Sequence, residues 1–348
     1  MLRVLHILPH RGGGAETYVD LLGGLADSEH EGVALSRGRT PLSAAASLPA
    51  GYPGVMRSAR RADLVHAHGD VAAALALPLL RGSPSVVTTH GLHFLRRATG
   101  ARRAAAERAL RAVARSAGCV LCTSQAEHDE LSALLGSALA QRLRTVPNGI
   151  DPPPPADPVE RADARAELRL EERDVAALFL GELEARKAPL VAVDAAQLAV
   201  SAGAPLVLLV AGDGPQAGAV RAHRSDVIRP LGFRSDPQRL LAAADIFVLP
   251  SEREGLSFAL LEAMGHGLAM VVSDGPGNPE AIGDAGVVVP TGDVAALAAA
   301  LGALARDPVQ RARLAAAAAA RLRASFGRER MLAGVGAAYA AALACHGA

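Results

Sequence analysis

Two glutamates eight residues apart are the first candidates for chemistry in this 348-residue chain. Glu254 lies in a loop that follows an apolar run, and Glu262 lies among apolar residues that recur at helical spacing. A carboxylate in such a helix is costly to bury unless it is paired or hydrogen-bonded. A ligand rich in hydroxyls, such as a ribose, could satisfy it. The simpler alternative puts Glu262 on the solvent side of the helix and gives Glu254 a favourable place near the helix dipole.

The loop before this helix contains Gly255 and Ser257 and brings backbone N–H groups to the helix N-terminus. Such a terminus is suited to a phosphate, because its first amides have no partner within the helix. One segment therefore offers carboxylates for sugar hydroxyls and amides for a phosphate.

The segment PSEREGLSFALLEAMGHG resembles the signature of the retaining nucleotide-sugar glycosyltransferases of family 4, which have the GT-B fold. The resemblance implies that Glu254 faces the donor sugar and that Glu262 binds the ribose of the nucleotide. It also places four residues of the intervening segment at the donor: Gly255, Leu256, Ser257 and Phe258.

A glycine-rich loop, Arg11-Gly-Gly-Gly-Ala-Glu16, follows the first apolar run and precedes an amphipathic helix. Glycines there let a substrate approach the backbone, although a tight turn alone would also need them. The third glycine of a dinucleotide fingerprint is missing. The loop resembles the GG-x-E loop of the family, which implies that Gly13, Gly14 and Glu16 lie near the diphosphate and the acceptor.

His90, in the segment TTHGLH, stands just after a predicted strand and thus at its carboxyl end. A histidine there can donate a hydrogen bond to a sugar hydroxyl or polarise a leaving group. The resemblance to the T-x-H position of the family selects His90. We interpret His66, His68 and His93 as residues that line the cleft or pack.

Arg186 and Lys187 follow the first predicted strand of the second half of the chain. Such a pair suits a diphosphate, with Arg186 bidentate and Lys187 a point charge. The family usually reads G-R-L-x-x-x-K-G here, whereas this sequence has Glu182 in place of the arginine and Ala188 in place of the glycine. Glu182 would repel a diphosphate unless it turns away and Arg186 serves instead.

Three further segments resemble donor-side segments of the family. They are VPNGID, AGDGPQA and LGFR, and they imply donor contacts for Asn148, Gly212, Gly232 and Phe233. The second segment also comes close to the dinucleotide fingerprint, but that site needs an acid at the end of the next strand. Asp226 opens that strand instead, so the pattern does not support an oxidoreductase. Glu280, in GNPE, resembles the G-x-P-E of the family.

Arginines crowd residues 96–115, with Glu107 as the only acid among them. Arg108, Arg111 and Arg115 share one face at helical spacing. Such a helix could hold an anionic membrane surface in peripheral contact. The alternative is a solvated face on which arginine stems cover alanines.

The elements that must position these residues alternate between apolar runs and helical stretches. Continuous apolar runs are typical of parallel strands covered on both faces, so the order predicts two doubly wound Rossmann-like sheets that face a cleft. The predicted strands are Leu2–Leu8, Asp63–Ala67, Ser85–Thr89, Cys119–Thr123, Leu143–Val146, Val175–Leu180, Leu206–Ala211, Asp226–Arg229, Asp245–Leu249, Ala269–Ser273 and Val287–Val289.

A proline tract, Asp151–Pro158, breaks this alternation and predicts a stiff linker. We expect an acceptor-side domain over residues 1–150 and a donor-binding domain over residues 151–325. In the GT-B fold a terminal helix crosses back onto the first domain, which we expect of residues 326–348.

Composition excludes several other classes of protein. The net charge of +1 and an aromatic content of 3% without tryptophan argue against a nucleic-acid binder. Three cysteines give no disulfide framework, and Cys119-x-x-Cys122 reads as part of a buried strand. We see no signal peptide and no stretch of roughly 20 apolar residues, so a cytoplasmic protein is expected.

The sequence therefore predicts a retaining glycosyltransferase that moves a hexose-type sugar from a UDP- or GDP-sugar to a hydroxyl of a saccharide, lipid or natural product. The expected catalytic residues are Glu254, His90, Lys187 and Arg186. No cluster of metal ligands is visible in the sequence, so we expect neither metal nor cofactor. The alternatives are a degenerate sugar-nucleotide-binding subunit and a nucleotide-sugar epimerase of the same fold.

Overall fold

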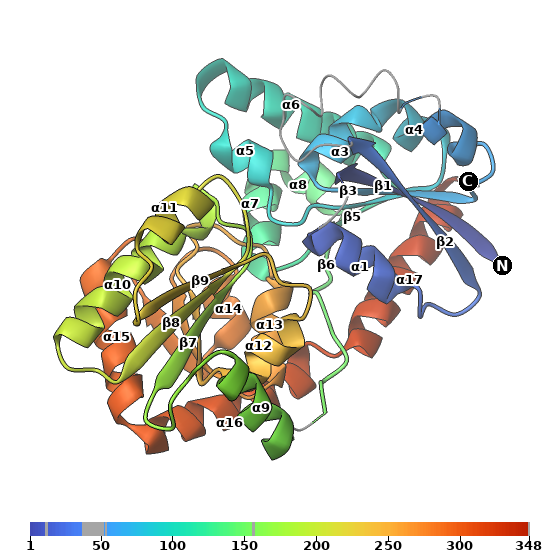
Figure 1. Ribbon diagram of the computed structural model, residues 1–348. Helices are drawn as coiled ribbons and strands as arrows, with labels where there is room; N and C mark the ends of the chain where they lie inside the picture. The colour runs from blue at the N-terminus through green and yellow to red at the C-terminus, as the bar shows by residue number, and fades with distance from the viewer. Residues whose placement is uncertain (11–12, 37–51, 53, 155–156, 347–348) are drawn as a thin grey trace. The chain divides into compact units, whose positions relative to one another are not determined.

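The computed structural model describes residues 1–10, 13–36, 52, 54–154 and 157–346. Arg11 and Gly12 of the glycine-rich loop, and residues 155–156 of the proline tract, lie outside the described part. The chain divides into two compact units (Figure 1). The first unit comprises Met1–Gly149 with Arg328–Ala348, and the second comprises Ile150–Gly327.

The first unit is built on a parallel six-stranded sheet of order β2-β1-β3-β4-β5-β6. Its strands are β1 (Leu2–His10), β2 (Ser28–Ser36), β3 (Leu64–His68), β4 (Ser85–Thr88), β5 (Cys119–Cys122) and β6 (Leu143–Thr145). The apolar runs predicted five of these six strands. The edge strand β2, with the sequence SEHEGVALS, was not predicted, because apolar residues gather only at its end.

Helices cover both faces of this sheet. They are α1 (Gly14–Leu22), α3 (Asp70–Leu75), α4 (Leu77–Gly82), α5 (His93–Arg97), α6 (Gly100–Ser116), α7 (Gln125–Leu135), α8 (Ser137–Ala140) and α17 (Arg328–His346). Odd-numbered residues of β1 and β3, such as Ile7 and Val65, form an apolar core with α3, α4 and α6. The C-terminal helix α17 contacts β4 and β5 (Figure 1).

The second unit contains a parallel sheet of order β12-β11-β10-β7-β8-β9. Its strands are β7 (Val175–Leu180), β8 (Leu206–Ala211), β9 (Ile228–Gly232), β10 (Ile246–Leu249), β11 (Ala269–Ser273) and β12 (Gly286–Val289). All six were predicted, although β9 runs further toward Gly232 than expected. The strand order reverses between β7 and β10, which makes that point the place where such sheets bind ligands.

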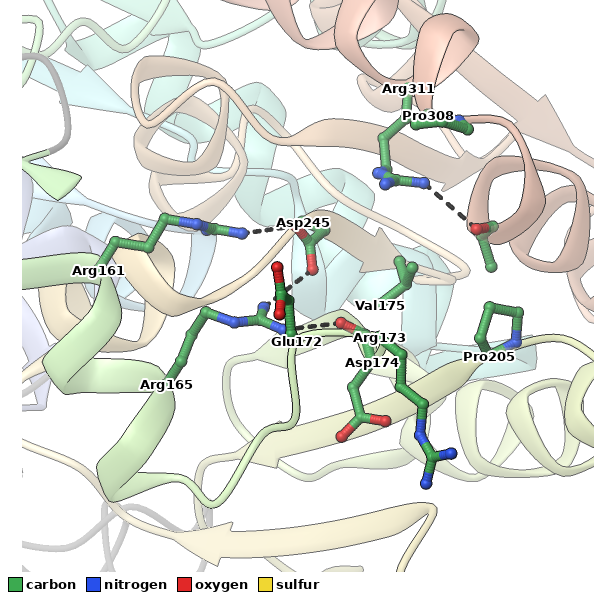
Figure 2. A pocket seen from close by; sticks show the side chains of 11 residues that line it. Arg161, Arg165, Glu172, Arg173, Asp174, Val175, Pro205, Asp245, Pro308 and Arg311 are labelled. Carbon is green, nitrogen blue, oxygen red and sulfur yellow. Dashed lines mark hydrogen bonds and ion pairs between the residues drawn. The ribbon is translucent and has the colours of Figure 1, made fainter.

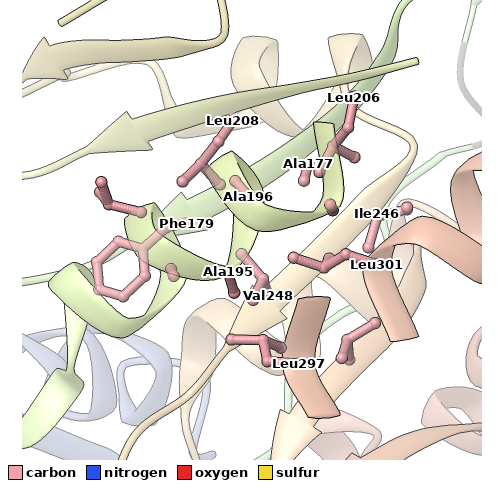
Figure 3. Close-up of a cluster of buried hydrophobic side chains, with 14 of the residues drawn as sticks. Ala177, Phe179, Ala195, Ala196, Leu206, Leu208, Ile246, Val248, Leu297 and Leu301 are labelled. Carbon is pink, nitrogen blue, oxygen red and sulfur yellow. The ribbon is translucent and has the colours of Figure 1, made fainter. Parts of the chain in front are cut away.

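Helices on both faces complete the second unit. They are α9 (Pro158–Glu167), the 3₁₀ turn η1 (Ala185–Lys187), α10 (Pro189–Ser201), α11 (Ala217–Ala222), α12 (Pro237–Ala243), α13 (Phe258–Gly265), α14 (Asn278–Ile282), α15 (Val294–Arg306) and α16 (Pro308–Ser325). Figure 3 shows one face of the core, where Phe179 and Val248 of the sheet lie near Ala195 of α10 and Leu301 of α15. Alanines on α10 let that helix pack closely on the strands.

Within the described residues, no helix is long and apolar enough to cross a membrane. Cys119 and Cys122 are free and buried in β5. Burial raises the pKa of the Cys122 thiol, which agrees with a packing role.

Candidate active site

A buried ion pair lies at the point where the strand order of the second unit reverses. Lys187 belongs to η1, just after β7, and Glu254 lies in the loop after β10. Lys187 Nζ is 2.5 Å from Glu254 Oε1, and Arg186 Nη1 is 3.4 Å from Glu254 Oε2. Glu254 is only 5% exposed. Two strands adjacent in the sheet but distant in the sequence therefore bring together three of the four predicted catalytic residues.

Arg186 has several acceptors besides Glu254. Its Nε and Nη2 donate to Glu184 Oε1 at 2.9 and 2.5 Å, and its Nη1 donates to the carbonyl of Arg253 at 3.2 Å. Burial opposes the charge of Arg186, but Glu254 and Glu184 outweigh it and raise the pKa of Arg186. Glu182 is exposed. A bidentate contact of Arg186 with a diphosphate would therefore require Glu184 to release the guanidinium.

Glu262 lies half-buried in α13. Burial raises the pKa of its carboxyl group. Within the described part of the chain, no side chain or backbone amide forms a hydrogen bond or ion pair with this carboxylate. This leaves the carboxylate available to a ligand. The helix itself begins at Phe258, because Ser257 before it is extended, which agrees with the loop predicted to contain Gly255 and Ser257.

Close backbone contacts between glycines fix the loops around this ion pair. A Cβ added to Gly277 would lie 1.7 Å from the carbonyl oxygen of Gly255, and one added to Gly212 would lie 1.8 Å from that of Gly181. Both glycines have positive φ, at 87° and 145°. The absence of a side chain at Gly212 thus lets the loop after β8 pack on the loop after β7.

Two residues at the carboxyl end of β9 complete this edge of the sheet. Gly232 has a φ of 70°, and its carbonyl accepts a hydrogen bond from the Gly212 amide at 2.8 Å. The Phe233 side chain that follows is 70% exposed. An exposed aromatic residue beside a predicted nucleotide site offers a flat apolar surface.

In the first unit, His90 lies in a loop with unusual backbone geometry. His90, Gly91 and Leu92 all have positive φ, at 50°, 102° and 50°. Glu127, which is fully buried, accepts hydrogen bonds from the Gly91 amide at 2.5 Å and the Thr123 amide at 2.7 Å. Burial raises the pKa of Glu127. Such a conformation is strained for His90 and Leu92, so the surrounding bonds must hold it.

A second buried carboxylate supports the other end of this loop. Asp70 accepts hydrogen bonds from the backbone amides of Phe94 and Leu95 at 2.8 and 2.9 Å.

Of the glycine-rich loop, Gly13 is exposed with a φ of 80°, and Gly14 and Glu16 lie in the first turn of α1.

His90 is also the end of a row of hydrogen-bonded imidazoles that crosses the sheet. His30 of β2, His6 of β1, His68 of β3 and His90 follow the strand order. The nitrogen atoms are 2.8 Å apart from His30 to His6, 2.8 Å from His6 to His68 and 3.0 Å from His68 to His90. We call these four residues the imidazole row.

His66 stacks on His68 but bonds elsewhere. Its Nδ1 is 2.8 Å from the hydroxyl of Tyr339 on α17, and its Nε2 is 2.8 Å from Thr88 Oγ1. The ring centroids of His66 and His68 are 4.2 Å apart. His66 therefore lies beside the imidazole row without belonging to it.

Burial keeps these histidines neutral. It lowers the pKa of His6 to about 3 and that of His90 to about 4, and it lowers those of His66 and His68 well below the usual value. The sequence indicated His66 and His68 only as lining or packing residues, and it gave no role to His6. Their even spacing on strands signals one common face, but His30 lies on the strand that was missed.

Three of these histidines could also hold a metal ion. The ligand atoms of His6, His66 and His68 lie within 4.8 Å of one another, which corrects the expectation that no cluster of metal ligands exists. However, tetrahedral zinc with bonds of about 2.0–2.1 Å separates nitrogen ligands by about 3.3 Å. The 2.8 Å between His6 Nδ1 and His68 Nε2 fits a hydrogen bond better.

A separate pocket lies at the opposite, amino edge of the second sheet (Figure 2). Its volume is about 420 Å³. Asp245 accepts from Arg161 Nη2 at 2.6 Å and from the Ala176 amide at 2.8 Å, and Arg165 Nη1 lies 3.3 Å away. These bonds join α9 to the strand ends, so we interpret the pocket as structural.

The arginine-rich region forms α5 and α6 and is only partly available to a partner. Arg96 is paired with Glu130 and is 6% exposed, and Arg103 is 3.0 Å from Glu107. Arg111 donates to the carbonyl of Leu134 at 3.0 Å. The side chains that remain exposed are Arg97, Arg102, Arg108 and Arg115.

Asn148, another predicted donor contact, is buried in the first unit.

Comparison with known proteins assigns the family. Residues 12–153 match the model described as Glycosyltransferase Family 4, and residues 174–307 match that described as Glycosyl transferases group 1. The chain therefore belongs to glycosyltransferase family 4, as the Glu254–Glu262 segment predicted.

Curated relatives agree with this assignment. Glycogen synthase of Mycobacterium tuberculosis is 32% identical over 282 residues, which are 76% of this chain and 66% of the relative. Alpha-maltose-1-phosphate synthase of Mycolicibacterium smegmatis is 30% identical over 249 residues, or 66% of this chain and 64% of the relative. The chain thus spans slightly less than two thirds of the length of these relatives.

Solved structures support the GT-B fold. HepE of Anabaena in complex with UDP-glucose superposes with a TM-score of 0.81 at 21% identity, covering 97% of this chain and 99% of that one. Sucrose-phosphate synthase of Thermosynechococcus elongatus gives 0.79 at 20% identity, with 99% and 100% covered.

Proposed function

We propose that this protein transfers a hexose-type sugar from a UDP- or GDP-sugar to an acceptor hydroxyl with retention of the anomeric configuration. The observation that carries the proposal is the buried Lys187–Glu254 pair at the reversal point of the second sheet. Family membership supports it, and so does the UDP-glucose in the structure of HepE.

In this proposal the second unit binds the donor. Lys187 and Arg186 face the diphosphate, Glu262 the ribose and Glu254 the sugar. The bond from the anomeric carbon to the phosphate oxygen breaks, the acceptor oxygen takes its place, and the acceptor proton leaves with the nucleotide. The first amides of α13, to which Ser257 gives no side-chain cap, stabilise the charge that develops on the leaving group. Cationic side chains thus take the place of a metal.

We assign acceptor binding to Gly13, Gly14 and Glu16 of the first unit, and we give His90 of the same unit a contact with a hydroxyl of the transferred sugar. A relative from Escherichia coli, 30% identical over 39% of this chain, is named as a galactosyltransferase that acts on a diphosphoundecaprenol-linked sugar. We therefore include lipid-linked sugars among the proposed acceptors, together with saccharides and natural products. If the acceptor is lipid-linked, we propose that Arg97, Arg102, Arg108 and Arg115 make the peripheral contact with the membrane.

A non-catalytic sugar-nucleotide-binding subunit is the second candidate. The observation that favours it is the acidic setting of Arg186, whose Nε and Nη2 are occupied by Glu184. A nucleotide-sugar epimerase is a third candidate and should release no free nucleotide when an acceptor is added, apart from slow hydrolysis.

Thermal unfolding with UDP, GDP, ADP, CMP and dTDP, in EDTA, tests the donor site. A ligand at a hundred times its Kd stabilises the protein by about 2.7 kcal/mol, which raises Tm by several degrees. We expect UDP or GDP to do so in the wild type and in Arg173→Ala, an exposed control at the amino edge, but not in Lys187→Ala.

Turnover is then measured as nucleotide released from the matching nucleotide sugar with acceptor present. Glu254→Gln should lose at least about 100-fold in kcat, because a charge that acts on the transition state is removed. Full activity in this variant would refute the site assignment. Nucleotide binding without any release in the wild type would favour the non-catalytic subunit.

A further inference from the structure

The imidazole row has a fixed direction because one end is anchored by a carbonyl group. The hydroxyl of Ser28 lies 2.7 Å from the carbonyl oxygen of Leu25, which can only accept, so the hydroxyl donates there. A serine has one hydroxyl proton. Its oxygen must therefore accept from His30 Nε2, which is 2.8 Å away. His30 thus carries its proton on Nε2.

This assignment passes from ring to ring. A neutral imidazole has one N–H donor and one lone-pair acceptor. His30 Nδ1 is then an acceptor, so His6 Nε2 donates to it. By the same argument His68 Nε2 donates to His6 Nδ1, and His90 Nε2 donates to His68 Nδ1. A reversed ring at any position would set two N–H groups or two lone pairs against each other in a buried layer.

We propose that the imidazole row holds His90 in the Nε2–H tautomer, so that His90 presents Nδ1 as a hydrogen-bond acceptor to a substrate hydroxyl. His30, His6 and His68 are positioning residues. The identity of the substrate rests on the proposed function, whereas the tautomer does not. This reverses the role expected from the sequence, in which His90 donates.

Three observations agree with an accepting Nδ1 on a ring of fixed orientation. Within the described ranges, no donor forms a hydrogen bond with His90 Nδ1. The backbone of His90 is also held in a strained conformation by neighbours that Glu127 fixes, so the ring has a defined orientation. Tyr18 packs edge-on against the ring, with centroids 5.0 Å apart, and limits its rotation.

The tautomer can be read directly in the ligand-free protein. Long-range ¹H–¹⁵N spectra of protein labelled with ¹⁵N-histidine separate the two neutral tautomers, and the signals missing in His90→Gln assign His90. We expect a single Nε2–H form at pH 7. An Nδ1–H form, or a doubly protonated ring at that pH, would overturn the proposal.

Matched variants test whether the imidazole row determines the tautomer of His90. His6→Phe interrupts the row, and His66→Phe makes the same change at an equally buried neighbour outside it. We expect His6→Phe to populate the Nδ1–H form of His90 and His66→Phe to leave the wild-type form. Ser28→Ala, at the half-buried anchor, is the milder variant in case His6→Phe fails to fold, and it should give a second, smaller set of His90 signals. An unchanged tautomer in both row variants would refute the role of the row.

Two further measurements distinguish the imidazole row from a failed donor site and from a metal site. Addition of UDP-glucose should move the ¹⁵N signal of His90 Nδ1 upfield, as a lone pair that accepts a hydrogen bond does. A protein that binds neither UDP-glucose nor a GDP-sugar but keeps the Nε2–H form contradicts the proposed donor and not the row. Stoichiometric zinc retained through purification, and lost in His6→Phe, would show a metal site in place of the row.

Discussion

Replacement of Glu262 should change the stability of the fold and the affinity for nucleotide in opposite directions. Its carboxylate is half-buried, its pKa is raised by burial, and no described residue neutralises it. Replacement by glutamine removes the cost of burying a charge, so we expect the free energy of unfolding to rise by up to about 1 kcal/mol. The same change should weaken nucleotide binding roughly tenfold or more, since a charge-assisted hydrogen bond contributes about 1.5–3 kcal/mol.

Urea unfolding with and without the nucleotide selected by thermal unfolding measures both effects. Glu172→Gln, an exposed carboxylate at the opposite edge of the sheet, is the control and should change neither quantity. A Glu262→Gln protein with reduced stability and wild-type nucleotide affinity would mean that the carboxylate has a structural partner and not a ligand.

At the residue scale, the sequence could predict the contacts that local spacing encodes. The eight-residue interval of Glu254 and Glu262 and the adjacent Arg186 and Lys187 are visible in the chain. It could not predict that Glu184 occupies the guanidinium of Arg186, because side-chain rotamers decide that contact. Nor could it predict the imidazole row, which depends on the order of strands far apart in the sequence.

At the scale of elements, loops packed backbone to backbone shape the donor site. Gly277 has a φ of 87°, and a Cβ added there would lie 1.7 Å from the carbonyl oxygen of Gly255, whereas Gly292 has a φ of 79° and no atom within 4 Å. Gly292→Ala should therefore cost only the conformational penalty of about 1–2 kcal/mol. Gly277→Ala should cost more and should displace the loop that carries Glu254.

The comparison needs two measurements on each variant, urea unfolding and the Tm rise with nucleotide. We expect Gly277→Ala to lose the nucleotide-dependent rise and Gly292→Ala to keep it. Equal stability losses in the two variants, with the rise intact in both, would show that the loop contact does not shape the site.

The elements themselves were largely encoded in local patterns. Of the twelve strands in the described residues, the sequence predicted eleven, most of them as apolar runs, because parallel strands covered on both faces need such side chains. The edge strand β2 was missed since its partly exposed residues show no such run.

At the scale of the whole molecule, the two units should respond differently to acid. His6 and His90 have pKa values of about 3 and 4 in the folded protein, and burial lowers those of His66 and His68 well below the usual value. In the unfolded chain these groups titrate near 6.5. The unfolded state thus binds more protons between pH 6.5 and about 4, so the first unit loses stability as the pH falls through this window.

Each histidine contributes a loss of about 1.4 kcal/mol per pH unit within that window. Asp70 and Glu127 oppose it, because burial raises their pKa values and protonation then favours the folded state. The five histidines of the first unit whose pKa values are lowered, His30 included, outnumber these two carboxyl groups. In the second unit, by contrast, the one histidine with a lowered pKa among the described residues is His266. The first unit should therefore unfold first.

Tyrosine fluorescence can follow the first unit alone. All three tyrosines, Tyr18, Tyr52 and Tyr339, belong to it, and the chain has no tryptophan. Urea unfolding at pH 7.5 and pH 5.0, followed by tyrosine fluorescence and by far-UV circular dichroism, compares the units. We expect the urea midpoint of the tyrosine transition, which reports the first unit, to be lower at pH 5.0 than at pH 7.5. The midpoint of the other transition seen by circular dichroism, which reports the second unit, should fall less. In His66→Phe the tyrosine midpoint should depend less steeply on pH, because one titrating group is gone, while His266→Gln should leave that dependence unchanged. A tyrosine midpoint that is equal at both pH values would mean that the buried histidines take up protons in the folded state, and the neutral imidazole row could not then exist.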